Sequence, residues 1–328
     1  MKAVVVSAIG GPEALVLRDV ADPVPAAGEI LVKVRYSGIN YAETLVRRGL
    51  VPAPPAPFVL GLEIVGTVAV LGDGVADFAV GQPVAAFARS GYAQYAVVPA
   101  PLAVPLDRPG CRVDPAQAIG VPCTGVTAHQ LLTLVGRLSK GDTVFVQGAG
   151  GGVGTMLGQQ AKALGAGRVI GSVGSASKAA FVLAHGYDEA IVYEGYLDRL
   201  RAATGGRGVD LYLEGISGRN LAAFGSFLAP LGRAVYFGDT SFSSETEIAI
   251  QHLRAGSWTI SGYSLGGLCE TAPRYWRPSA LAVLGMMADG AIHDAAVTMF
   301  APAEAARAHG LLESRQSRGK LGLDWSML

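Results

Sequence analysis

A glycine-rich segment between a predicted strand and a predicted helix constrains the fold most. Residues 143–154 read TVFVQGAGGGVG, and a helical pattern follows to Gly165. Glycines there would let the backbone approach a pyrophosphate closely and aim the free N–H groups of a helix N-terminus at it. The flanking strand and helix are the context that a dinucleotide-binding turn requires. The predicted contacts come from Ala149, Gly151, Gly152, Val153 and Gly154.

Strand and helix patterns alternate after this segment. The predicted strands are 168–173, 190–193, 209–214 and 233–238, and the predicted helices are 176–185, 196–204 and 219–229. This alternation with short loops is typical of a doubly wound parallel sheet. Asp114 and Pro115 predict a helix start just before this region, because Asp suits the N-cap and Pro the first helical position.

The first hundred residues have a different pattern, with short β-rich runs separated by Pro and Gly. Strands are predicted at 2–6, 30–36, 59–71 and 92–98. The last region, from about residue 273, is mostly helical, with possible strands at 298–300 and 320–325. At 328 residues the chain is long enough for about two domains. The sequence therefore predicts an α/β protein with a β-rich, barrel-like domain and a doubly wound domain.

Charge and hydropathy exclude several classes of protein. The chain has 26 Lys plus Arg and 26 Asp plus Glu, so its net charge of zero argues against a nucleic-acid binder. Hydrophobic residues make up 50%, which excludes a disordered chain. We find neither an apolar stretch of about 18 residues nor a signal-peptide cleavage pattern. A cytoplasmic protein with a small-molecule partner, and with no nucleic-acid or membrane partner, is expected.

The end of the second strand of the glycine-containing unit indicates which dinucleotide binds. Residues 171–178 read GSVGSASK and contain no Asp or Glu, the residues that usually select NADH. Lys178 would lie in the first turn of a helix capped by Ser175, where a cation opposes the helix dipole unless an anion is near. The 2′-phosphate of NADPH is such an anion, and a solvated lysine is the alternative. The expected cofactor is NADPH.

Several motifs, spread in order over nearly the whole chain, resemble a known family. They are Gly38-Ile39-Asn40-Tyr41-Ala42-Glu43, the segment 65–81 (VGTVAVLGDGVADFAVG), Thr124-Gly125-Val126-Thr127-Ala128, the glycine segment from Ala149 to Gly154, SASK ending at Lys178, and Leu312-Glu313-Ser314-Arg315-x-x-x-Gly319-Lys320. Together they resemble the zinc-free, zeta-crystallin-like quinone oxidoreductase group of the medium-chain dehydrogenases/reductases. The resemblance implies a GroES-like catalytic domain (1–118 and 266–328), an inserted NADPH-binding Rossmann domain (119–265) and a homodimer.

The resemblance also implies roles for individual residues. Lys178, Tyr193 and Arg315, the last in the terminal helix, match residues that hold the adenosine phosphate. Asn40 and Thr127 match positions near the nicotinamide, and with Tyr41 they are the candidate catalytic residues. Further cofactor contacts are expected from Ser175, Phe237, Gly238 and Lys320.

A metal site is not expected. Zinc-dependent relatives carry Cys and His at the first two ligand positions, where this chain has 39–41 (INY) and 61–63 (GLE). Of the three cysteines, Cys111, Cys123 and Cys269, only Cys123 matches a ligand position. One thiolate with Glu63 is a poor set for tetrahedral zinc, so Cys123 is interpreted as a small apolar residue of the pocket.

These features predict a metal-free, NADPH-dependent oxidoreductase that transfers a hydride to quinones or other α,β-unsaturated carbonyl compounds. Enoyl-reductase relatives carry a proton-donating Tyr where this chain has Val51. Glu43 replaces the usual Asp of its motif and is either a functional carboxylate or a salt-bridged surface group. An enoyl or enone reductase of a biosynthetic, polyketide-type pathway remains the main alternative. A non-catalytic NADPH-binding protein is the alternative of another class.

A rival motif is 262–266 (GYSLG), which matches the G-x-S-x-G nucleophile elbow of hydrolases. Such an elbow needs a helix directly after Ser264. Gly266, Gly267 and Pro273 predict that no helix follows, which argues against a hydrolase.

His185 and His309 both stand in Ala-His-Gly and are expected at helix ends, where an imidazole suits the dipole.

Overall fold

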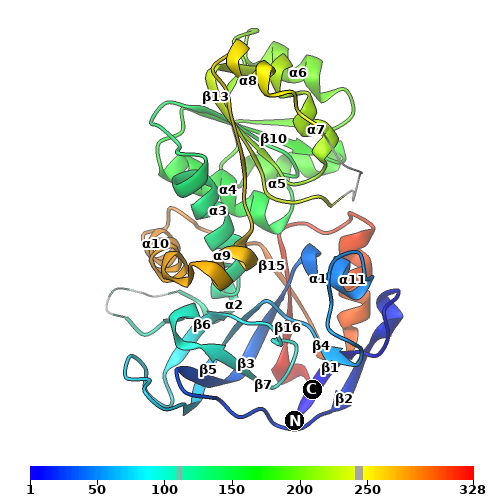
Figure 1. The fold of residues 1–328 in the computed structure, drawn as a ribbon, viewed down its shortest axis with the longest axis vertical. Coiled ribbons are helices and arrows are strands. Elements are labelled where there is room, and N and C mark those ends of the chain that lie inside the picture. Colours follow the sequence, from blue (N-terminus) through cyan, green and yellow to red (C-terminus); the bar gives the residue numbers. More distant parts are fainter. Residues whose placement is uncertain (109, 111–112, 241–246) are drawn as a thin grey trace. The chain divides into compact units, whose positions relative to one another are not determined.

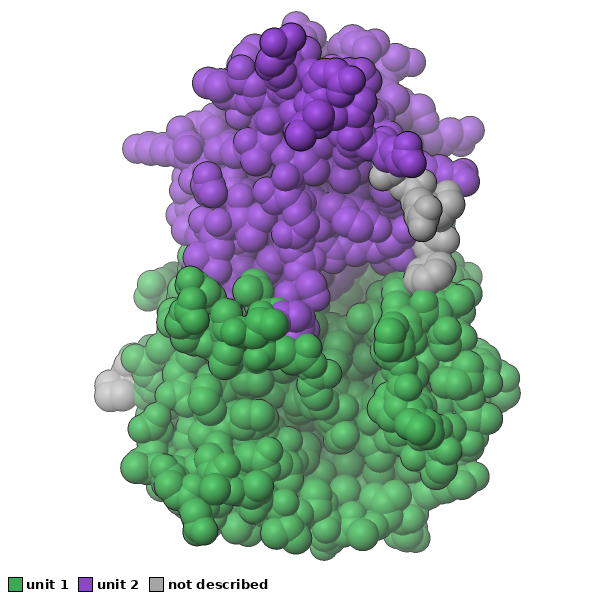
Figure 2. Space-filling view, viewed as in Figure 1, with its two compact units in different colours: residues 1–126, 268–328 green, residues 127–267 purple. Residues whose placement is uncertain are grey.

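The computed structural model describes residues 1–108, 110, 113–240 and 247–328, so Cys111 lies outside the described residues. The chain divides into two compact units (Figure 2). The first unit consists of Met1–Val126 and Leu268–Leu328, and the second of Thr127–Gly267. The second unit is thus inserted into the sequence of the first.

The first unit is built mainly from strands (Figure 1). They are β1 (Lys2–Val6), β2 (Leu15–Asp19), β3 (Glu29–Ile39), β4 (Phe58–Val59), β5 (Glu63–Leu71), β6 (Pro83–Phe87), β7 (Tyr95–Pro99), β8 (Ala103–Pro105), β15 (Val297–Phe300) and β16 (Lys320–Asp324). Seven of them form a sheet in the order β15-β16-β3-β5-β6-β8, with β7 also paired to β3. A smaller sheet has the order β2-β1-β4. The predicted β-rich character is confirmed.

Among the described residues, five α-helices belong wholly or mostly to the first unit. They are α1 (Tyr41–Arg47), α2 (Pro115–Ala118), α9 (Leu265–Thr271), α10 (Trp276–Ala288) and α11 (Ala305–Glu313). The predicted helix start at Asp114 is confirmed, since its carboxylate accepts a hydrogen bond from the N–H of Ala116 at 2.7 Å. No helix of the described residues is long and apolar enough to cross a membrane.

The second unit contains a parallel sheet. Its strands are β9 (Thr143–Val146), β10 (Arg168–Val173), β11 (Glu189–Val192), β12 (Val209–Glu214), β13 (Leu228–Tyr236) and β14 (Thr259–Gly262). They are hydrogen-bonded in the order β11-β10-β9-β12-β13-β14, and every neighbouring pair is parallel. The chain order reverses direction at β9, which confirms the predicted doubly wound sheet.

The helices of the second unit are α3 (Val126–Gln130), α4 (Gly152–Ala163), α5 (Ala179–Leu183), α6 (Tyr196–Ala203), α7 (Gly218–Ala222) and α8 (Ile250–Ala255). The helix predicted at 219–229 is wrong at its C-terminal end. A 3₁₀ turn, Phe224–Ser226, follows α7, and β13 starts at Leu228. Phe227 and Leu228 are buried in the sheet core, which explains the change.

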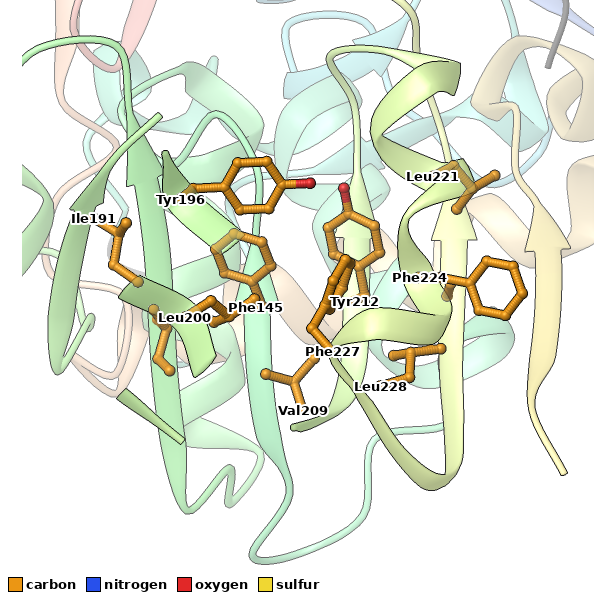
Figure 3. Packing of buried hydrophobic residues seen from close by; sticks show 12 residues of the cluster. Phe145, Ile191, Tyr196, Leu200, Val209, Tyr212, Leu221, Phe224, Phe227 and Leu228 are labelled. Carbon is orange, nitrogen blue, oxygen red and sulfur yellow. The ribbon is translucent and has the colours of Figure 1, made fainter. Parts of the chain in front are cut away.

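Aromatic side chains form the centre of the core under this sheet (Figure 3). Phe145 of β9 stacks on Tyr212 of β12 with ring centroids 5.5 Å apart, and on Tyr196 of α6 at 5.7 Å. Phe227 meets Tyr212 edge-on at 4.9 Å. The hydroxyl groups of Tyr196 and Tyr212 point toward one another in Figure 3. Because rigid aromatic packing fixes β9, it also fixes the turn that follows this strand.

Candidate functional site

The glycine-rich turn joins the end of β9 to the start of α4. Gly148 has a φ of 75°, a left-handed conformation that favours glycine. The N–H of Ala149 donates to the carbonyl of Ser172 at the end of β10, at 2.9 Å. Gly151 is the extended N-cap residue, and α4 begins at Gly152. The free N–H groups of this N-terminus therefore lie at the carboxyl edge of the sheet, where an anion is favoured.

The space around the turn fits a dinucleotide. A Cβ on Gly151 would have only the carbonyl oxygen of Gly148 within 4 Å, at 3.6 Å, and one on Gly174 would meet no atom within 4 Å. A Cβ on Gly154 would lie 2.5 Å from the carbonyl oxygens of Gly148 and Ala149. Gly154 thus allows the helix to pack closely on the turn, while the space beside Gly151 stays open.

Lys178 lies against this turn. It ends a 3₁₀ turn, Ala176–Lys178, and its Cδ is 3.3 Å from the position of a Cβ on Gly150. Ser175 is the N-cap residue of this turn, as expected, but its side chain caps no backbone N–H. Its Oγ lies 2.8 Å from the Oγ of Ser177 instead.

Two further predicted residues lie at the same edge of the sheet. Tyr193 follows β11, donates its N–H to Val173 at 2.8 Å and donates its hydroxyl to Asn220 Oδ1 at 2.9 Å. Phe237 follows β13, and its ring lies 2.6 Å from the position of a Cβ on Gly215. The structure brings these residues and the glycine turn to one edge because parallel strands all end there. Gly238 directly follows Phe237.

In the first unit, Asn40 stands at the N-terminus of α1 as its N-cap. Its N–H donates to Glu43 Oε2 at 2.6 Å, which is part of a capping box. Tyr41, the first residue of this helix, is half-buried. Thr127 belongs to the second unit, in α3, and is 7% exposed.

Glu43 is buried in the first unit and is not the surface group that remained possible from the sequence. Its carboxylate also accepts from the N–H of Leu62 at 2.7 Å and from the hydroxyl of Tyr92 at 2.6 Å. Burial outweighs these hydrogen bonds and raises the pKa of Glu43 to about 7. Burial likewise raises the pKa of Tyr92 well above its usual value.

His309 continues this network. Its Nε2 lies 3.2 Å from the hydroxyl of Tyr92. The expectation of a cap is wrong here, because His309 lies inside α11 and is fully buried. Burial, with Arg47 nearby, lowers the pKa of His309 to about 3. His185 follows α5, and its Nδ1 lies 2.7 Å from the carbonyl of Phe181, as a C-terminal cap requires.

A second buried network surrounds Glu63 and Lys320. The ammonium of Lys320 lies 2.9 Å from the carbonyl of Ile39 and 2.7 Å from Asn40 Oδ1, and it forms an ion pair with Glu63. Asn40 Nδ2 donates to Glu63 Oε1 at 2.8 Å, and the N–H of Cys123 donates to Glu63 Oε2 at 2.9 Å. Both carboxylate oxygens of Glu63 are therefore in use.

Sequence reasoning missed the connections of Glu43, Glu63, Tyr92 and His309. One signal was present: Lys320 precedes the apolar residues 321–323 of β16, and a buried lysine needs a partner. Arg315 is also displaced from its expected place, since α11 ends at Glu313 and Arg315 follows with a φ of 58°.

The donor atoms for a metal are few. In the ranges that the structure describes, no group of three or more His, Cys, Asp or Glu side chains could hold an ion. Cys123 and Cys269 are free thiols, and burial with Glu63 nearby raises the pKa of Cys123 well above its usual value.

The expectation that no helix follows Ser264 is wrong, because α9 begins at Leu265, directly after Ser264. Ser264 Oγ accepts a hydrogen bond from the N–H of Gly267 at 3.2 Å. This bond satisfies a backbone N–H in the first turn of α9, which begins here although Gly266 and Gly267 lie in it.

Comparisons with known proteins agree with both units. Residues 26–108 match the alcohol dehydrogenase GroES-like domain, and residues 152–284 match the zinc-binding dehydrogenase family. A quinone oxidoreductase of Pseudomonas aeruginosa is 33% identical over 95% of this chain and 96% of its own length. Quinone oxidoreductase 1 of Escherichia coli is 32% identical over 94% of this chain and 95% of its own.

Solved structures are similar over nearly the whole chain. The Escherichia coli quinone oxidoreductase complexed with NADPH has a TM-score of 0.90 at 30% identity, covering 99% of this chain and 100% of that one. A mycobacterial protein complexed with NADPH has a TM-score of 0.89 at 33% identity, with coverage of 99% and 100%.

Proposed function

This chain belongs to the zeta-crystallin-like quinone oxidoreductase group of the medium-chain dehydrogenases/reductases, and from that premise we propose that it transfers a hydride from NADPH to quinones without a metal ion. It is an oxidoreductase that binds NADPH. The absence of zinc, one finer part of the proposal, is supported by the buried Glu63–Lys320 pair. This pair uses the carboxylate beside Cys123 for an ammonium group, and the residues that the structure describes offer no group of three or more metal ligands.

The second unit supplies most of the cofactor contacts in this proposal, and Arg315 comes from the first unit. The N-terminus of α4, at the end of the turn from Ala149 to Gly154, binds the pyrophosphate, since the space beside Gly151 is open. Lys178 and Arg315 pair with the 2′-phosphate. The remaining proposed contacts are Ser175, Tyr193, Phe237 and Gly238.

Asn40 and Tyr41 of the first unit are among the groups that orient the acceptor. When bound, NADPH supplies the hydride, and the protein contributes mainly by positioning. Asn40, Tyr41 and Thr127 are proposed to hold the acceptor and the nicotinamide by hydrogen bonds. Reduction of a quinone places negative charge on oxygen, which an amide N–H stabilises and solvent protonates. Val51 cannot protonate carbon, so a quinone suits this site better than an enone.

The test is the initial rate of NADPH oxidation with 1,4-benzoquinone, with a simple enone and, in reverse, with NADP⁺ and an alcohol. We expect quinones to react fastest, activated enones more slowly and alcohols negligibly. An enone that reacts much faster than any quinone would instead identify an enoyl or enone reductase. NADPH binding without turnover of any acceptor would identify a non-catalytic NADPH-binding protein.

The metal part of the proposal has its own measurement. Elemental analysis of the purified protein should find far less than one zinc per chain, and quinone reduction should survive a strong chelator. About one zinc per chain together with loss of activity on chelation would contradict it and would favour alcohol chemistry.

We also propose a cytoplasmic location. Cys123 and Cys269 are free thiols in the described part of the chain, and thiols persist where the redox environment is reducing. Cell fractionation with a cytoplasmic marker enzyme tests this.

A further inference from the structure

The hydrogen bonds of Lys320 account for its whole ammonium group. Its three N–H groups have three acceptors in the first unit: the carbonyl of Ile39, Asn40 Oδ1 and the Glu63 carboxylate. The side chain is 1% exposed. An ammonium held in this way has no hydrogen left for a cofactor phosphate, so the direct cofactor contact expected from the sequence is not its role.

These bonds leave the Asn40 amide one orientation. Oδ1 faces an ammonium at 2.7 Å, and Nδ2 faces a carboxylate oxygen at 2.8 Å. If the amide turned by 180°, its NH₂ group would face the ammonium and its oxygen would face the carboxylate. Both contacts would be repulsive, and two charge-assisted hydrogen bonds would be lost.

The fixed orientation defines what Asn40 can offer a ligand. The Nδ2 group carries two hydrogens. One of them is donated to Glu63, and the other meets no acceptor in the described parts of the chain. Asn40 is 9% exposed. The amide therefore presents a single donor, and the group that it meets has to be an acceptor, such as a carbonyl oxygen.

We propose that Lys320 is a positioning residue, which acts through Asn40 and locks its Nδ2 as a hydrogen-bond donor toward the carbonyl oxygen of the acceptor. This inference rests on the proposed function. In the reaction, the acceptor gains a hydride, which is one proton with two electrons, from NADPH, which becomes NADP⁺. The electron pair resides on an acceptor oxygen until water supplies a proton. A donor already aimed at that oxygen favours the charged state without reorganisation.

The main test is a double-mutant cycle on the full-length protein with NADPH and 1,4-benzoquinone. We expect Lys320→Met to lower kcat at least tenfold and to leave the NADPH dissociation constant, measured by fluorescence, within twofold of wild type. Since Lys320 acts through Asn40, Lys320→Met combined with Asn40→Ala should be no slower than Asn40→Ala alone. The proposal would be overturned if the two substitutions lowered kcat by independent factors that multiply in the double variant. Weaker NADPH binding with an unchanged kcat in Lys320→Met would also overturn it.

A second variant guards against misfolding, because Lys320→Met leaves a buried carboxylate unpaired. The double variant Lys320→Met with Glu63→Gln removes both charges. The new amide at position 63 can donate to Asn40 Oδ1, so it also allows the Asn40 amide to turn by 180°. This double variant should fold, bind NADPH normally and still turn over at least tenfold more slowly than wild type. Recovery of wild-type turnover would refute the role of Lys320. The matched control is Lys162→Met, which removes a lysine that pairs with Asp188 at the surface, at 2.5 Å, and should not change turnover.

A spectroscopic readout is independent of turnover. The sequence has two asparagines, Asn40 and Asn220, so protein labelled with ¹⁵N-asparagine gives two side-chain NH₂ pairs, and Asn40→Ala assigns them. One proton of the Asn40 pair should have a strongly downfield chemical shift, because it is hydrogen-bonded to Glu63. This resonance should move upfield in the double variant Lys320→Met with Glu63→Gln. An unchanged spectrum would contradict the locked amide.

Absence of quinone turnover in the wild-type protein would contradict the proposed function as well, whereas turnover insensitive to Lys320→Met would contradict this inference alone.

Discussion

Lys178 is the residue on which the choice between NADPH and NADH should depend most. Its stem lies 3.3 Å from the Cβ position of Gly150, over the glycine turn, and residues 171–178 contain no carboxylate. One charge-assisted hydrogen bond contributes roughly 1.5–3 kcal/mol, or about tenfold or more in affinity. Lys178→Ala should therefore raise the NADPH dissociation constant about tenfold and leave that of NADH unchanged.

Fluorescence titration of both dinucleotides measures this effect, with Lys162→Ala as a control on the same unit. An equal loss of affinity for NADPH and NADH in Lys178→Ala would show that the lysine does not read the 2′-phosphate.

Glu43 and His309, joined through Tyr92, should have opposite effects on the pH dependence of stability. Glu43 has a raised pKa of about 7. Between its ordinary value and pH 7, the folded chain keeps a proton that the unfolded chain releases, so the free energy of unfolding falls as pH rises. His309 has a lowered pKa of about 3. Between pH 3 and its ordinary value, only the unfolded chain takes up the proton, so the free energy of unfolding rises with pH.

The two contributions overlap and oppose each other from about pH 4.5 to 6.5, each with a slope of about 1.4 kcal/mol per pH unit. Relative to wild type, His309→Gln should lose stability as pH rises through this range, and Glu43→Gln should gain it. Urea unfolding at several pH values gives these slopes. Parallel curves for all three proteins would mean that neither group titrates as described.

At the scale of elements, helix α4 depends on glycine where it packs on the rest of its unit. A Cβ on Gly158 would lie 2.3 Å from the carbonyl oxygen of His185 and 2.3 Å from Cε2 of Tyr187. Gly158→Ala should therefore lower the free energy of unfolding by about 1–3 kcal/mol, the usual cost of overpacking.

Helix α10 offers the matched control. Gly285 is exposed, and a Cβ there would meet no atom within 4 Å. Gly285→Ala should raise stability by about 0.5–1 kcal/mol, because alanine loses less backbone entropy in a helix. Chemical denaturation of both variants makes the comparison, and a destabilisation of similar size in both would contradict the packing argument.

The elements also show what the sequence could and could not predict. Strands β10 and β12 have the predicted bounds, because short apolar runs between glycines signal buried parallel strands. The predicted strand starts later than β13, since Pro230 and Gly232 argue against a strand. They are tolerated here because they lie where the register of the pairing shifts, between Val209 and Leu211 of β12.

The candidate site was predicted only in part, for a physical reason. Motif spacing pointed to Asn40 and to the glycine turn, which are local features. The partner of Asn40 is Lys320, 280 residues away along the chain. A contact between residues so far apart in the sequence depends on the pairing of β16 with β3. Local sequence patterns do not predict such a pairing.

At the scale of the whole molecule, the parallel sheet has an edge, at β14, that pairs with no further strand of the described residues. Strand β14 pairs with β13 on one side and is the last strand of its sheet. Its four residues, TISG, include no charge and no proline, the devices that usually protect an edge strand from pairing with another chain. An unprotected edge favours addition of a strand from a second copy, in line with the expected homodimer.

The prediction is that the protein has about twice the chain mass of 33.6 kDa in solution and that one charge on this edge reduces it to a monomer. Thr259 is exposed on β14, and Thr259→Lys would place like charges close together across a two-fold axis, at a desolvation cost. Thr298→Lys is the matched control, because Thr298 is an exposed threonine on β15, the edge strand of the other large sheet. Light scattering after gel filtration should find a monomer for Thr259→Lys and a dimer for Thr298→Lys. A dimer that survives in Thr259→Lys would place the interface elsewhere.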